Sequence, residues 1–107
     1  MTRPVPATSI AAVGPVSPAD HALIERFGDA LLLEDGLSRN TLDAYRRDLG
    51  LLAAWLLRDR ASSLASATEA DLRAYIALRH PGSKATSGNR RLSTYRRFYR
   101  MLARERI

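Results

Sequence analysis

The spacing of the apolar residues constrains this chain most, because they recur every three or four positions in four separate segments and nowhere alternate as in a β-strand. The clearest stripe consists of Leu42, Tyr45, Leu49, Leu52, Ala53 and Leu56. Such spacing places apolar side chains on one face of an α-helix, which turns once in 3.6 residues. The sequence therefore predicts an all-α fold in which each helix buries its stripe against the others.

Capping residues and helix breakers mark where the four helices should begin and end. The expected N-caps, in chain order, are Ser17, Ser38, Thr68 and Ser83. Gly36 ends the first helix, and His80-Pro81-Gly82 stops the third. The second helix is predicted over residues 39–58 and the fourth over 84–105, while the loop between the second and third helices tucks Leu64 into the core. Connections this short indicate two helical hairpins.

A chain of 107 residues is expected to form one domain, which we predict over residues 17–107. Residues 1–16 are rich in proline and show no apolar period, so a flexible N-terminal tail is expected there. The absence of cysteine excludes disulfides and thiolate metal sites. No apolar run approaches the roughly 20 residues of a membrane span, and no export signal is recognised, so we expect a cytoplasmic protein without membrane contact.

Basic residues are concentrated at the C-terminal end of the chain. The net charge is +6, yet residues 84–107 alone hold eight basic residues against a single acid, Glu105. The rest of the chain is nearly neutral. A polyanion is the commonest partner of a compact domain polarised in this way.

On a helical wheel of the fourth segment the arginines share one arc, opposite the apolar residues. That arc holds Arg90, Arg96, Arg97, Arg100 and Arg104, with Thr86, Asn89 and Ser93 among them. The planar guanidinium can bind phosphate oxygens or a guanine edge through two hydrogen bonds, and short polar side chains fit between them. No acid occurs between Arg90 and Arg104, whereas a solvated helix face usually mixes charges. The arc favours nucleic-acid contact; the alternatives are a solvated face or a helical protein-interaction module with a basic docking face.

The beginning of the second helix offers another candidate surface. Ser38 caps the helix beside Arg39, Asn40 and Thr41, which suits a phosphate bound at a helix N-terminus. Simple capping with a surface pair between Asp43 and Arg47 explains these residues equally well.

No set of side chains in this sequence has the pattern of a catalytic or metal site. Trp55 and the four tyrosines are interpreted as core residues, with the hydroxyl groups at the rim. His21 and His80 stand alone near helix ends, without the neighbouring ligands that a metal requires. We therefore expect no cofactor, no metal and no enzymatic activity from this stretch of chain.

Two stretches resemble the tyrosine recombinase (phage integrase) family, in particular its Xer branch, which resolves chromosome dimers. Residues 37–49, LSRNTLDAYRRDL, resemble the pattern of leucine, Ser-x-Asn-Thr and then Tyr-x-x-Asp-Leu. Residues 84–99, KATSGNRRLSTYRRFY, are similar to the pattern of Ser or Thr, Arg-x-Leu-Ser and Arg-x-Phe-Tyr. Arg91 stands where an apolar residue is more typical. The likeness covers residues 21–107, with both motifs in the family's order.

The resemblance implies a core-binding domain of SAM-like fold, a four-helix orthogonal bundle that clamps double-stranded DNA at a recombination half-site. The implied DNA contacts are Ser38, Arg39, Asn40, Thr41, Arg46, Lys84, Thr86, Asn89, Arg90, Ser93, Arg96, Arg97 and Arg100. It further implies that the catalytic residues belong to a separate domain, and that full-length protomers act as a tetramer in DNA integration, recombination and chromosome segregation. No catalytic residue carries over to this sequence.

Overall fold

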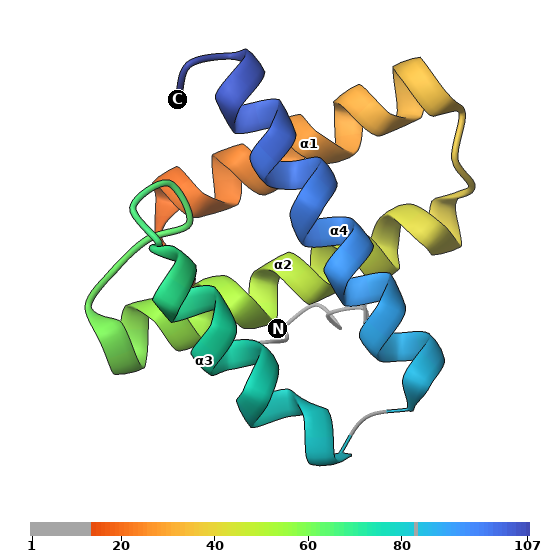
Figure 1. The fold of residues 1–107 in the computed structure, drawn as a ribbon. Coiled ribbons are helices and arrows are strands. Elements are labelled where there is room, and N and C mark those ends of the chain that lie inside the picture. The colour runs from red at the N-terminus through yellow and green to blue at the C-terminus, as the bar shows by residue number, and fades with distance from the viewer. Residues whose placement is uncertain (1–13, 83) are drawn as a thin grey trace, which may run out of the picture.

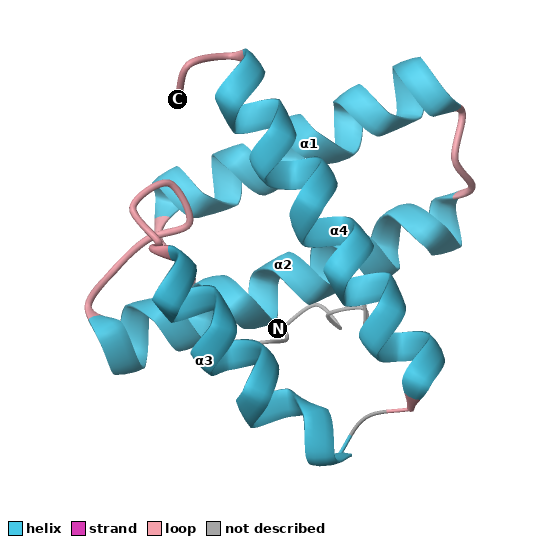
Figure 2. Cartoon of the chain, in the orientation of Figure 1, coloured by secondary structure: helices cyan, strands magenta, loops and turns pink. Residues whose placement is uncertain are grey.

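The four capped segments form four α-helices (Figures 1 and 2). The computed structural model describes residues 14–82 and 84–107. The helices are α1 (Pro18–Asp35), α2 (Arg39–Arg60), α3 (Glu69–Arg79) and α4 (Ala85–Arg104), and a short 3₁₀ helix, η2 (His80–Gly82), follows α3. Within the described ranges no residue lies in a β-strand. The all-α prediction is confirmed.

Local hydrogen bonds explain the helix ends. The Ser17 hydroxyl accepts the N–H of Asp20 at 3.1 Å, and Gly36 ends α1 with a left-handed φ of +61°. Thr68 and Asp71 form a reciprocal capping box at the start of α3. The predicted cap Ser83 lies outside the described residues; the N-cap position of α4 is held by Lys84, whose side chain makes no capping bond.

The two hairpins lie across one another. Figure 1 shows α1 and α2 side by side, joined by residues 36–38, with the hairpin of α3 and α4 crossing them. Between the hairpins lies one apolar core, whose fully buried members include Ile24, Leu49, Leu52, Leu56, Leu64 and Phe98. Phe27 packs edge-on against Phe98, with ring centroids 5.5 Å apart. Trp55 is buried, as the sequence predicts, and its ring lies 5.2 Å from that of Tyr75.

Leu64 fixes the loop between α2 and α3 to the core through its backbone as well as its side chain. Its N–H donates to Asp20 Oδ1 at 3.0 Å, and its carbonyl accepts the hydroxyl of Tyr99 at 2.8 Å. Asp20 is 1% exposed, and burial raises the pKa of its carboxyl group. Side chains from α1 and α4 thus satisfy both polar groups of a loop residue that lies out of reach of water.

Arg46 occupies the space where α1 and α2 meet. A Cβ atom on Gly28 would lie 2.6 Å from Arg46 Nη2 and 2.8 Å from its Nε, so glycine gives the guanidinium room to lie over α1. The Nε atom is 3.7 Å from a carboxylate oxygen of Glu25, and Nη1 is 3.7 Å from one of Asp43. Arg46 therefore links the two helices of the first hairpin.

Little of the predicted N-terminal tail falls within the described residues. Val16, which lies within the predicted tail, packs partly buried against the core. The prediction for residues 1–13 lies outside the described part of the chain. Among the helices of that part, none is long and apolar enough to cross a membrane.

Candidate nucleic-acid interface

Helix α4 has a buried face and an exposed polar face, as its wheel predicts. Tyr95, Phe98 and Leu102 are buried, while the opposite side carries exposed or half-exposed residues. Of the predicted contacts on α4, Thr86, Asn89, Arg96 and Arg100 are exposed, and Arg90, Ser93 and Arg97 are half-buried.

Arg96 and Arg100 are the cations of this face best placed for an external anion. Neither of them has a carboxylate partner among residues 14–82 and 84–107. They lie one helical turn apart, and Asn89 and Ser93 continue the same stripe toward the start of α4. This row can offer hydrogen-bond donors to successive phosphate or base groups.

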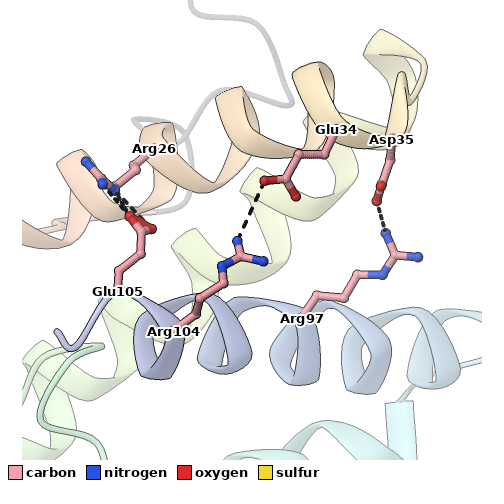
Figure 3. Close-up of polar contacts among 6 residues, drawn as sticks. All are labelled: Arg26, Glu34, Asp35, Arg97, Arg104 and Glu105. Carbon is pink, nitrogen blue, oxygen red and sulfur yellow. Dashed lines mark hydrogen bonds and ion pairs between the residues drawn. The ribbon is translucent and has the colours of Figure 1, made fainter.

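The remaining arginines of the arc meet acids from another helix, a pairing that the wheel of α4 alone does not predict. Figure 3 shows two of these pairs between α1 and α4: Arg97 with Asp35 at 3.0 Å and Arg104 with Glu34 at 3.8 Å. In the same row, Arg26 of α1 pairs with Glu105, the residue that follows α4. The arc contains no acid of α4 itself, as predicted, but two acids of α1, Glu34 and Asp35, lie beside it. Glu34 and Asp35 follow one another at the end of α1, which carries no basic residue in its last turn. Their negative charges oppose the helix dipole there, and the arginines of α4 offset this cost.

Arg90 joins α4 to α2 through a buried acid. Its Nε donates to Asp48 Oδ2 at 2.8 Å and its Nη2 to Oδ1 at 2.9 Å, while Asp48 is 2% exposed. The hydrogen bond to Asp48 raises the pKa of Arg90. Asp48 lies three residues after Tyr45 and directly before Leu49, within the apolar stripe of α2. An acid within a buried apolar stripe requires a partner, so the position of Asp48 could have indicated an ion pair with a cation from another helix.

The beginning of α2 presents its predicted contacts to solvent. Ser38, Arg39 and Asn40 are exposed, and Thr41 is half-buried. The Ser38 hydroxyl accepts the N–H of Thr41 at 3.3 Å and lies 2.9 Å from its hydroxyl, so capping is part of its role. Arg46 instead reaches toward α1, as described above.

Helices α2 and α4 begin without an acidic residue in the first turn, whereas α1 and α3 begin with acids. In Figure 1 both starts lie at the right of the molecule. At the second start, Lys84 is exposed beside backbone N–H groups that no side chain caps. Free N–H groups and the positive end of a helix dipole favour anions.

The inner side of α4 includes buried polar residues that the sequence analysis did not place there. Arg91 is 7% exposed, and Thr94, which donates to the carbonyl of Arg90 at 2.8 Å, is fully buried. The hydroxyl of Tyr95, expected at the rim, is buried and has no hydrogen-bond partner in the described residues. Across those same residues no group of three or more His, Cys, Asp or Glu side chains could hold a metal ion.

Comparison with known proteins shows the family to which the chain belongs. Residues 24–106 match the family described as phage integrase, N-terminal SAM-like domain. The chain is 46% identical over 107 residues to tyrosine recombinase XerD of Ralstonia nicotianae, covering 100% of this chain and 33% of the relative. It is 50% identical over 89 residues to tyrosine recombinase XerD of Proteus mirabilis, with 82% of this chain and 28% of the relative covered.

A further relative is tyrosine recombinase XerC of Xylella fastidiosa, 41% identical over 83 residues, which make up 77% of this chain and 28% of that protein. The chain thus spans about a third of the length of the curated relatives it matches. No solved structure matches. The family match covers most of the described helices and contains both sequence motifs, so this chain belongs to the phage integrase N-terminal SAM-like family, as a core-binding domain of the Xer type.

Proposed function

We propose that this domain binds double-stranded DNA at a recombination half-site, with the beginning of α2 and the exposed face of α4 against the duplex. The proposed contacts are Ser38, Arg39, Asn40, Thr41, Lys84, Thr86, Asn89, Arg90, Ser93, Arg96, Arg97 and Arg100. A DNA contact by Arg46 stays a prediction, because its guanidinium lies over Gly28 and near Glu25 of α1.

The observation that carries this proposal is the row of short polar side chains that ends in Arg96 and Arg100, two cations without an acidic partner in the described part of the chain. Arginine without an internal partner retains its full charge and all five N–H donors for an external anion. The first-turn N–H groups of α2 and α4 add two places where phosphates can be bound. Phosphate contacts from these groups would fix the orientation of the domain, and side chains such as Asn89 would read base edges.

We further propose that this domain acts as part of a whole tyrosine recombinase. The named relatives of this chain are tyrosine recombinases about three times as long, so strand cleavage, rejoining and assembly with further protomers would depend on residues beyond this stretch. In that setting the present domain would hold the DNA during integration or chromosome segregation, in the cytoplasm where bacterial DNA lies.

Binding can be tested by fluorescence anisotropy with a labelled duplex that carries a Xer half-site, titrated at several salt concentrations. Each phosphate neutralised contributes about −0.9 to the slope of log K against log salt, so four contacts would give a slope of about −3.6. The double variant R96Q/R100Q should weaken binding and make the slope shallower by about 1 to 2.

Arg58 provides the matched control. It is an exposed arginine at the far end of α2, nineteen residues from Arg39 and therefore roughly 28 Å along the helix. R58Q changes one charge but should leave the salt slope unaltered. Weak binding that does not depend on salt would contradict the proposal. Saturable binding to an acidic protein without any DNA binding would favour a protein-docking face instead.

A further inference from the structure

The ion pair between Asp48 and Arg90 has an inner and an outer side. The Asp48 side chain is 3% exposed, whereas the Arg90 side chain is 38% exposed. The carboxylate therefore lies within the contact between α2 and α4, and the guanidinium covers it from outside. An anion that approaches this crossing meets the arginine before the acid.

The hydrogen bonds of the pair leave donors available. Nε and one N–H of Nη2 are directed at the two carboxylate oxygens, at 2.8 and 2.9 Å. A guanidinium carries five N–H groups in a plane, so three remain, and these point away from the acid. That number suffices for a bidentate contact with phosphate.

The pair also fixes where those donors point. A free arginine side chain must lose rotamer freedom before it can hold a phosphate, which lowers the affinity gained from the contact. Arg90 has lost that freedom on folding, because two hydrogen bonds to a buried acceptor hold its guanidinium in one plane. We propose that Asp48 is a positioning residue, which presents Arg90 to the DNA backbone as a pre-ordered phosphate donor. This inference rests on the proposed DNA-binding function.

The proposal and the net charge predict opposite changes in DNA affinity when Asp48 is removed. Removal of an acid from a DNA-binding domain raises its net positive charge, which by long-range electrostatics strengthens binding to DNA. Removal of Asp48 should weaken binding instead, because Arg90 loses its fixed orientation. Asp35 is the matched control: it also pairs with an α4 arginine, Arg97, but through one bond of 3.0 Å, and its side chain is 43% exposed.

The experiment compares the affinities of D48N, D35N, R90Q and D48N/R90Q for the labelled half-site duplex. D48N is expected to weaken binding roughly fivefold to tenfold, about the net value of one hydrogen bond, because the arginine remains present but is no longer held in place. D35N should bind as tightly as the unaltered chain or more tightly. The double variant D48N/R90Q should bind no more weakly than R90Q, because Asp48 acts through Arg90 alone.

Circular dichroism of each variant establishes that it is folded before binding is compared. R90K supplies a second test if D48N unfolds, since lysine keeps a cation beside Asp48 but cannot form the planar two-bond contact. R90K should also weaken binding by several fold; affinity equal to that of the unaltered chain would overturn the proposal. So would D48N binding as tightly as D35N. If D48N behaves like D35N while the unaltered chain and D35N still bind DNA in a salt-dependent way, only the positioning role of Asp48 is overturned. If the unaltered chain shows no salt-dependent binding, the proposed DNA-binding function is overturned as well.

Discussion

Replacement of Asp20 by alanine should destabilise the domain by about 1–3 kcal/mol, the cost of leaving a buried hydrogen-bonding group unsatisfied. The group in question is the N–H of Leu64, a fully buried loop residue that donates to Asp20 Oδ1 at 3.0 Å. Alanine provides no acceptor for this N–H.

The variant D20N separates the hydrogen bond from the charge, because the amide oxygen of asparagine can still accept the Leu64 N–H. Burial raises the pKa of Asp20 above its ordinary value of 3.8, so the folded chain holds this proton more tightly than the unfolded chain. The ionised carboxylate is then penalised at neutral pH, and the contribution of Asp20 to stability falls as pH rises through its folded-state pKa. The unaltered protein should therefore gain stability relative to D20N as pH is lowered from about 7 toward about 4.

Urea denaturation followed by far-ultraviolet circular dichroism measures both effects as free energies of unfolding. D20A should unfold at clearly lower urea than D20N at neutral pH. If the two variants unfold at the same urea concentration, the bond to Leu64 adds nothing measurable and the reasoning is refuted. If the difference between the unaltered protein and D20N stays constant with pH, the burial argument for Asp20 is refuted separately.

Three further predictions use the same denaturation assay. Tyr95→Phe should leave stability unchanged or raise it by up to about 1 kcal/mol, because the buried hydroxyl has no partner in the described chain, whereas Tyr99→Phe should lower it by about 1 kcal/mol through loss of the bond to the Leu64 carbonyl. Equal effects of the two changes would contradict this assignment. Gly28→Ala should stabilise α1 by about 1 kcal/mol only when Arg46 is also replaced by alanine, because the Arg46 guanidinium fills the space for a Cβ atom. The same gain with Arg46 in place would show that this contact does not affect stability. Thr68→Ala should cost about 1 kcal/mol through loss of the capping box on α3 and Thr68→Ser much less, and a cost shared by both would point to the methyl group instead.

The sequence predicts the helices well because the signals that define them are local. The Ser17, Ser38 and Thr68 caps each bond to a backbone N–H three residues away, so a short stretch contains the whole interaction. The second helix was predicted to end at residue 58, but it runs to Arg60 because Ala61, rather than a glycine, adopts the left-handed conformation that ends it.

The pairing of charges could not be predicted in the same way. Arg97 and Asp35 are 62 positions apart, and Arg90 and Asp48 are 42 apart, so only the packing of the hairpins decides that they meet. The wheel of α4 identified the correct exposed side but treated its arginines as equivalent. In the folded domain they form two groups. Arg96 and Arg100 face solvent without an acid among the described residues, whereas Arg90, Arg97 and Arg104 each pair with one.

The row of acids and arginines between α1 and α4 gives the domain built-in counterions. Under the proposed function, an Arg97 that turned to a phosphate would free Asp35 to attract a cation from solution, which would partly cancel the cations that the DNA releases. A salt titration then registers fewer contacts than the protein makes, and the difference should disappear in D35N. The difference in salt slope between the unaltered chain and variants of the acids at the end of α1 would therefore count the arginines that exchange an acid for a phosphate.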